Sequence, residues 1–172
     1  MPDLNDLFSG IRFVVVGGTA TSLYMPLRMT RDVDILVAAT DAPEAERALV
    51  ESGATSEGPL SINNPLNIKE SSWKLPDGSY LDVLSSARPW VKEALATPNR
   101  DSAGLPIISL PYLVLMKLAS SRGVDLGDLS RILGGADEDS LSEARAVVRQ
   151  YLPDAVEDME SLTELGRLEF QE

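Results

Sequence analysis

Two aspartates lie inside a segment that otherwise has the composition of a buried β-strand. The segment is "DVDILVA", residues 32–38, and its acids are Asp32 and Asp34. Since side chains two apart in a strand point to the same face, the two carboxylates project together, away from the apolar side chains between them. Carboxylates in such a place cost free energy unless something pairs with them. The spacing therefore predicts ligands for divalent cations, as in metal-assisted phosphoryl transfer.

A third carboxylate, Asp82, lies in the apolar segment "YLDVLSS". If this strand lies beside residues 32–38 with matching pleat, the three acids form one cluster. Each acid also has a plain structural interpretation. An isolated Asp-x-Asp is commonly a solvated strand end or a helix cap, and Asp82 alone could lie on an exposed hairpin face. The order of the segments along the chain favours the cluster.

A glycine pair stands between the preceding apolar run and a short polar segment, in "VVVGGTATSLY". Between a strand and a helix, Gly17 and Gly18 let the backbone pass close to an anion, and the start of the helix directs free N–H groups towards it. Thr19 adds a hydroxyl donor. The turn is predicted to hold the phosphates of a nucleotide, although a glycine pair is by itself often only a tight turn.

Composition narrows the chemistry further. The 172 residues include no cysteine and no histidine, which excludes disulfides, thiol nucleophiles, histidine-based triads and the usual zinc sites. With oxygen ligands only, the expected metal is Mg²⁺ or Mn²⁺. The net charge is -12, and residues 134–172 hold eleven acids against three basic residues. Such a chain needs a local basic patch to bind nucleic acid.

The elements that would position these residues indicate an α+β protein, with a mixed β-sheet flanked by helices and a C-terminal helical extension. Helix, strand and helix are expected at residues 4–8, 11–16 and 19–24, and a further helix at 42–52. Residues 53–65 are turn-rich and predict a loop or an irregular edge. "PDG" at residues 76–78 predicts a hairpin between the strands on either side. Helices are expected at 88–96, 111–121 and 124–133, and a loop at 97–106.

Gly134 and Gly135 mark the plainest boundary in the chain. Residues 1–133 are expected to form the domain that carries the site. Residues 134–172 are expected to form two acidic amphipathic helices packed on that domain. These helices either cover the sheet or contact a partner protein.

The order of these segments resembles the nucleotidyltransferase superfamily typified by DNA polymerase beta. "GGTATSLYMPLRMTRDVDILV" is similar to the subset found among bacterial abortive-infection toxins, where Arg-x-Thr-x-Asp-x-Asp is typical, and the later "LMKLASSRGVDLGDL" also resembles that subset. The match covers about residues 11–133. A family serine is often found where this chain has Gly18 or Thr19, and the large C-terminal domain of longer relatives has no counterpart.

The resemblance implies roles for individual residues. Asp32 and Asp34 would ligate the catalytic metals, and Asp82 would complete the cluster and help to deprotonate or orient the attacking hydroxyl. Arg28 matches the family arginine and would either touch the substrate or brace the loop before Asp32. The implied contacts to the triphosphate are Gly17, Gly18, Thr19 and Lys117. For Lys117 a side chain at the helix edge, with its charge in solvent, is the alternative.

A second group, Arg122, Asp125 and Asp128, is open to two interpretations. The residues could form a salt-bridged helix junction, which is the favoured one, or belong to the site. The resemblance implies transfer of a nucleoside monophosphate from an NTP to a hydroxyl of RNA such as tRNA, of a protein or of a small molecule, within a toxin–antitoxin or defence system. The alternative function is an inactive nucleotide- or partner-binding module. With neither a signal peptide nor a long apolar run, a cytoplasmic protein without membrane contact is expected.

Overall fold

A computed structural model gives the structure of the protein at residues 1–25, 32–60 and 64–170. Within these ranges, seven strands form one mixed sheet in the order β3-β4-β5-β2-β1-β7-β6. The central strands β1, β2 and β5 are rich in β-branched and leucine side chains, as expected for strands covered on both faces. The strands are β1 (Phe13–Val16), β2 (Asp32–Ala38), β3 (Thr55–Leu60), β4 (Lys69–Lys74), β5 (Tyr80–Ser86), β6 (Asn99–Arg100) and β7 (Pro106–Ile107).

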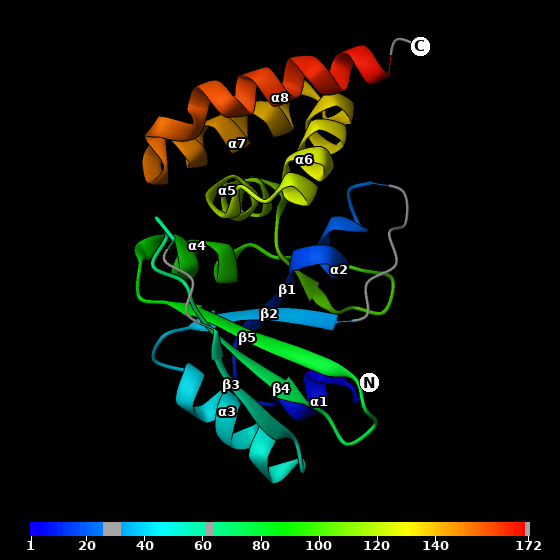
Figure 1. Cartoon of the computed structure of the whole chain (residues 1–172), viewed down its shortest axis with the longest axis vertical. Coiled ribbons are helices and arrows are strands. Elements are labelled where there is room, and N and C mark those ends of the chain that lie inside the picture. The colour runs from blue at the N-terminus through cyan, green and yellow to red at the C-terminus, as the bar shows by residue number, and fades with distance from the viewer. Residues whose placement is uncertain (26–31, 61–63, 171–172) are drawn as a thin grey trace.

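Helices cover both faces of the sheet (Figure 1). On one face lie α1 and α3, and on the other lie α2, α4 and α5, with α6, α7 and α8 forming an outer layer beyond α5. The α+β class and the mixed sheet flanked by helices are therefore confirmed. The helices are α1 (Leu4–Leu7), α2 (Gly17–Thr21), α3 (Ala42–Glu51), α4 (Pro89–Ala96), α5 (Leu110–Ser120), α6 (Gly123–Gly135), α7 (Glu138–Tyr151) and α8 (Val156–Glu169), with a 3-10 turn at Pro153–Ala155.

Within the described ranges the sheet contains four antiparallel pairs (β1–β2, β3–β4, β4–β5 and β6–β7) and two parallel pairs (β1–β7 and β2–β5). β1 runs antiparallel to β2, and β4 and β5 form the hairpin predicted around "PDG". β2 and β5 are parallel neighbours, joined by the crossover through α3, β3 and β4. A parallel pair requires a long connection of this kind, so the contact between β2 and β5 depends on the whole intervening segment.

Two loops predicted from sequence contain strands. The turn-rich segment forms the edge strand β3, whose pairing with β4 shifts register between Ser56 and Gly58. A bulge and a proline, Pro59, are both typical of an edge strand, which agrees with the irregular edge that was expected. The loop at 97–106 contains β6 and the start of β7, two-residue strands too short to show a periodicity in sequence.

The C-terminal helices pack on α5 and α6 through a second apolar core. That core includes Leu118 of α5, Leu133 of α6 and Met159 of α8. Gly134 and Gly135 are the last two residues of α6. A Cβ on Gly134 would lie 2.3 Å from the carbonyl carbon of Gly166, so these glycines allow α6 and α8 to cross at backbone contact. The glycine pair thus lies at the end of α6, where Gly134 also permits close packing against α8, and a domain boundary at this point stays a prediction.

None of the helices in the described ranges combines the length and the apolar character needed to cross a bilayer.

Candidate active site

The pairing of β2 with β5 brings two predicted site residues side by side. Asp34 is the register partner of Asp82, and Asp32 is the partner of Tyr80 two residues earlier. Neighbouring strands lie about 4.8 Å apart, and partners in parallel strands point to the same face. The expected adjacency of the two strands with matching pleat is confirmed. Asp34 and Asp82 are half-buried, whereas Asp32 is exposed at the start of its strand.

Gly17 lies directly against Asp34. Val16, the last residue of β1, pairs with Asp34, so the chain enters α2 beside the carboxylate. A Cβ placed on Gly17 would lie 1.8 Å from Oδ2 of Asp34, and the φ of Gly17 is +63°. Both facts require glycine, since any side chain would collide with the acid and L residues rarely adopt this conformation. The glycine turn therefore lies in contact with one of the two aspartates of β2, through Gly17 and Asp34.

The carboxylates disfavour one another's charge. Burial is the largest cause that raises the pKa of Asp34, to about 7. The negative charges of Asp82 and Glu70 add to this effect, and that of Asp32 adds less. A cation bound beside these acids would offset their mutual repulsion.

The donor set suits a hard divalent metal. Oδ1 of Asp82 is buried and has no hydrogen-bond partner in the described structure, although a buried acceptor is normally satisfied. As the side chains stand, no three acids in the described ranges already converge on one point in the manner of a metal cage. Asp34 and Asp82 nevertheless offer carboxylate oxygens on one face, and such oxygens are the ligands that Mg²⁺ and Mn²⁺ prefer.

Hydroxyl groups hold α2 in place beside the acids. Thr19 donates from Oγ1 to the backbone oxygen of Asp32 at 3.5 Å, which connects the helix to the start of β2. Thr21 donates to the carbonyl of Gly17 at 2.8 Å and Ser22 to that of Gly18 at 3.4 Å. A phosphate contact by Gly17, Gly18 and Thr19 stays a prediction; of the three, Gly17 is the one that lies against the carboxylate of Asp34.

Sequence reasoning missed a fourth acid, Glu70. On β4, Ser72 pairs with Asp82 and Glu70 pairs with Leu84, so Glu70 shares the face of Asp82 one pleat further along. Burial and then the charge of Asp82 raise the pKa of Glu70. The signal was present in the sequence. A hairpin centred on Asp77 gives this register directly and places Glu70 beside the cluster.

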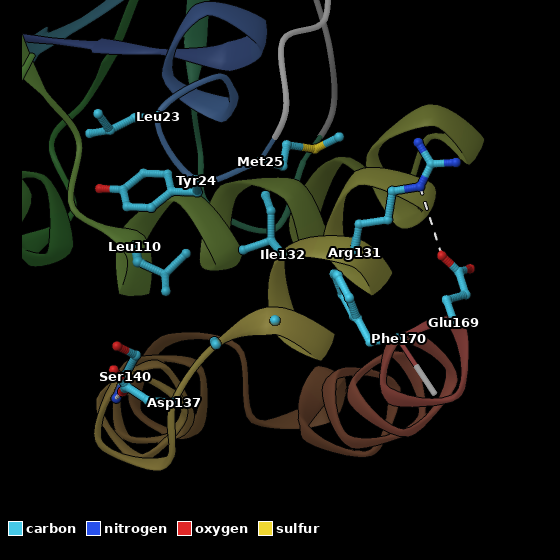
Figure 2. A pocket seen from close by; sticks show the side chains of 12 residues that line it. Leu23, Tyr24, Met25, Leu110, Arg131, Ile132, Asp137, Ser140, Glu169 and Phe170 are labelled. Atoms are coloured by element: carbon cyan, nitrogen blue, oxygen red, sulfur yellow. Dashed lines mark hydrogen bonds and ion pairs between the residues drawn. The ribbon is translucent and has the colours of Figure 1, made fainter. Parts of the chain in front are cut away.

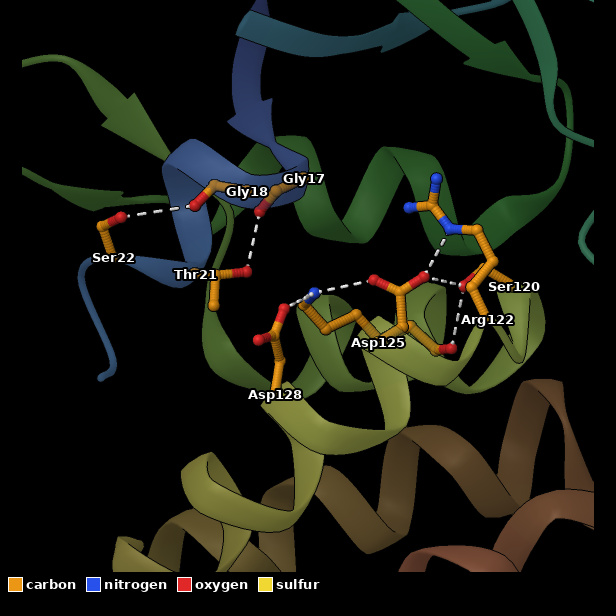
Figure 3. A network of polar contacts seen from close by, with 9 residues as sticks. Gly17, Gly18, Thr21, Ser22, Ser120, Arg122, Asp125 and Asp128 are labelled. Atoms are coloured by element: carbon orange, nitrogen blue, oxygen red, sulfur yellow. Dashed lines mark hydrogen bonds and ion pairs between the residues drawn. The ribbon is translucent and has the colours of Figure 1, made fainter. Parts of the chain in front are cut away.

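Lys117 lies in a buried ion cluster between α5 and α6. Its ammonium donates to Oδ1 of Asp125 and to Oδ2 of Asp128, both at 2.9 Å (Figure 3). The side chain of Lys117 is 5% exposed, and those of the two aspartates are similarly buried. The salt-bridged junction proposed from sequence for the two aspartates is therefore present, with Lys117 at its centre. A direct phosphate contact by Lys117 stays a prediction.

Arg122 connects this cluster to the carboxylates. Its Nε donates to Oδ2 of Asp125 at 2.7 Å, and this hydrogen bond is the largest cause that raises the pKa of Arg122. The charge of Arg122 in turn lowers the pKa of Asp34 and of Glu70, so its guanidinium acts electrostatically on the site. Arg28, which the resemblance assigned either to the substrate or to the loop before Asp32, lies outside the described residues.

A cavity of about 730 Å³ opens elsewhere on the molecule, where α2, α5, α6, α7 and α8 come together (Figure 2). Its wall is partly apolar and partly polar, with Ile132, Phe170, Asp137 and Ser140 among the lining residues. Arg131 and Glu169 form a loose ion pair at one side, with 3.8 Å between Nε and Oε2. The lining shares no residue with the carboxylate cluster.

No protein-family model matches the chain, and no curated protein sequence matches it. Several solved structures resemble it in chain path. The antibiotic-resistance factor ANT(2'')-Ia in complex with adenylyl-2''-tobramycin is 15% identical, with a TM-score of 0.48 over 93% of this chain and 89% of that one.

A protein from Thermotoga maritima, provisionally assigned as a nucleotidyltransferase, is 18% identical, with a TM-score of 0.49 over 77% of this chain and 91% of that one. The lincosamide antibiotic adenylyltransferase LnuA, bound to lincomycin, is 15% identical, with a TM-score of 0.44 over 83% of this chain and 90% of that one. At such identities and scores, the function of this chain has to be argued from its own residues.

Proposed function

We propose that the protein is a metal-dependent nucleotidyltransferase, which moves a nucleoside monophosphate from an NTP to a hydroxyl acceptor. The observation that carries the proposal is the placement of Asp34 beside Asp82, with the glycine turn packed against Asp34. Paired carboxylates supply metal ligands, and a turn without side chains supplies backbone N–H groups for phosphate. The resemblance of the sequence to nucleotidyltransferases rests on these same residues.

Asp32, Asp34 and Asp82 would hold Mg²⁺ or Mn²⁺. The unpartnered Oδ1 of Asp82 and the crowding around Asp34 support this assignment, because a cation would relieve both. When bound, the metal would neutralise charge on the phosphates and polarise the reacting phosphoryl group. Gly17, Gly18 and Thr19 would bind the β- and γ-phosphates.

The order of the strands suggests the direction of the reaction. In a phosphoryl transfer the attacking and leaving oxygens lie in line, on opposite sides of the phosphorus. The glycine turn follows β1, whereas Asp82 lies on β5, on the far side of β2. The acceptor hydroxyl would enter from the β5 side and form the bond to the α-phosphorus while the bond to the bridging oxygen breaks. Pyrophosphate leaves, and Asp82 accepts the proton.

A labelling experiment tests the proposal. The protein, Mg²⁺ and each α-labelled NTP are incubated with total RNA, with protein extract, or with a panel of hydroxyl-bearing small molecules. The wild type is expected to transfer label to one of these acceptor classes, and chelation of the metal should abolish the transfer. The class that carries label identifies the acceptor and with it any role in a toxin–antitoxin or defence system.

The matched variants are Asp82→Asn, at the site, and Asp139→Asn, an exposed acid on α7. Asp82→Asn should lower the rate by about 10²-fold or more, the range typical for loss of one preorganised catalytic group. Asp139→Asn should leave it unchanged. Absence of label on all acceptors with every NTP, or equal labelling by the Asp82 variant, would refute the proposal.

A further inference from the structure

The buried ammonium of Lys117 is fully engaged by protein groups. Two carboxylates accept from it at 2.9 Å, and its side chain is 5% exposed. A ligand contact by the Lys117 ammonium would weaken its two buried ion pairs, with Asp125 and Asp128, which is unfavourable. The lysine therefore serves to neutralise and fix two aspartates.

Asp125 in turn fixes an exposed arginine. Besides Lys117, it accepts hydrogen bonds from Ser120 Oγ and Arg122 Nε. Burial alone would raise the pKa of Asp125, but the hydrogen bonds from its three donors outweigh this effect and hold the pKa below its usual value. Asp125 is therefore ionised and rigidly held, and the side chain of Arg122 is 71% exposed while Asp125 is 4% exposed. One end of the guanidinium is anchored and the other faces solvent.

The guanidinium of Arg122 has hydrogen-bond donors that Asp125 does not use. Its contact with Asp125 uses Nε, and among the described residues its two terminal nitrogens have no partner (Figure 3). Two amino groups in one plane match the geometry of phosphate oxygens, which makes arginine suited to two-pronged phosphate contacts. Fixing the side chain beforehand also lowers the entropy lost when it binds.

The charge of Arg122 acts electrostatically on the carboxylate cluster. Asp34 and Glu70 both raise the pKa of Arg122, and Arg122 lowers theirs. Figure 3 shows the guanidinium of Arg122 on the same side of the buried ion cluster as Gly17 and Gly18. In addition, α2, which begins with the glycine turn, contacts α5, the helix of Lys117. Metal, phosphate and guanidinium would then meet in one space.

We propose that Arg122 is the cationic residue that contacts the phosphates of the bound NTP, and that Lys117 and Asp125 are positioning residues that hold it there. The proposal rests on the proposed function and deepens it. It assigns to Arg122 the phosphate contact that the family resemblance gave to Lys117. Lys117 and Asp125 then hold Arg122 in position, and the exposed guanidinium of Arg122 contacts the phosphates.

Binding of inorganic triphosphate, which has neither base nor sugar, tests the assignment. Calorimetric titrations in Mg²⁺ compare the wild type with Arg122→Gln, Arg122→Lys and the control Arg131→Gln, an arginine of the same helix that is similarly exposed. Arg122→Gln is expected to weaken binding of triphosphate and of NTP at least tenfold. Arg122→Lys should bind with intermediate affinity, because it keeps the charge and loses the planar fork. Arg131→Gln should match the wild type.

The unphosphorylated nucleoside separates this role from a structural one. Arg122→Gln should bind the nucleoside as the wild type does and should remain folded, because Lys117 and Ser120 still donate to Asp125. Equal triphosphate affinity of Arg122→Gln and the wild type would overturn the assignment and leave the proposed function standing. Failure of the wild type to bind either triphosphate or any NTP would overturn both.

Discussion

Replacement of Asp34 by Asn is expected to stabilise the metal-free protein above pH 7 while it abolishes nucleotide transfer. The pKa of Asp34 is about 7 in the folded protein, against an ordinary value of 3.8. Between these two values the folded state binds more protons than the unfolded state, so the free energy of unfolding falls as the pH rises. Above pH 7 Asp34 is ionised, and the free energy of unfolding of the wild type is lowered by the full cost of burying that charge. Asparagine has a similar shape without that charge.

The size of the effect follows from the shift in pKa. A shift of about three units corresponds to roughly 4 kcal/mol, and partial exposure of the acid reduces this to on the order of 2–3 kcal/mol. Urea denaturation in chelator at several values between pH 5 and pH 8 measures it. The wild type should lose stability over this range, Asp34→Asn should lose less, and the control Asp139→Asn should follow the wild type. Parallel curves for the wild type and Asp34→Asn would contradict the burial and crowding of Asp34.

The same substitution should remove activity. Loss of a partner that only orients a metal ligand typically costs 10–100-fold, so loss of the ligand itself is expected to cost about 10³-fold or more. Stability and activity should thus move in opposite directions in one variant. Asp34 would then be an example of an acid retained for function at the expense of stability.

Replacement of Gly17 by Ala should damage both the fold and the site. The added Cβ would lie 1.8 Å from Oδ2 of Asp34, in a residue with a φ of +63°. The backbone strain costs about 1–2 kcal/mol, and the carboxylate must also turn away from its place. We expect a loss of about 2–4 kcal/mol in the free energy of unfolding, and a loss of at least about 10²-fold in transfer rate.

Gly10→Ala provides the matched control. Gly10 also has a positive φ, +84°, but nothing lies within 4 Å of an added Cβ. The Gly10→Ala variant therefore carries the backbone strain without the collision, and we expect its transfer rate to equal that of the wild type. Denaturation and rate measurements on both variants separate the two effects. Equal behaviour of the two variants would show that contact with Asp34 is unimportant.

The sequence predicted the parts of the site that local patterns determine. β2 and the hairpin of β4 and β5 follow from β-branched runs and the "PDG" turn, and the glycine turn follows from its position after β1. That Asp82 would lie beside Asp34 could only be a conditional prediction, because the pairing of β2 with β5 spans more than forty residues of intervening chain.

What the sequence did not reveal depends on tertiary packing. Glu70 joins the cluster through the register of the hairpin, and Lys117 is engaged by acids contributed by the next helix. The packing role of Gly134 against Gly166 could not be read from sequence, because a glycine that permits helix crossing and a glycine that ends a helix look the same there. In each case the deciding contact is between elements, where residue type and local spacing carry little information.

Binding of Mn²⁺ to the wild type and to Asp34→Asn, followed by calorimetry at pH 7 in buffers of different ionisation enthalpy, tests the central claim most directly. If the acids of β2 and β5 form a metal site, the wild type binds Mn²⁺ and releases protons, because burial raises the pKa of Asp34 to about 7 and the metal displaces its proton. Asp34→Asn should bind at least tenfold more weakly and release fewer protons. Equal affinity of the two proteins, or the absence of binding to the wild type in the presence of NTP, would contradict the account.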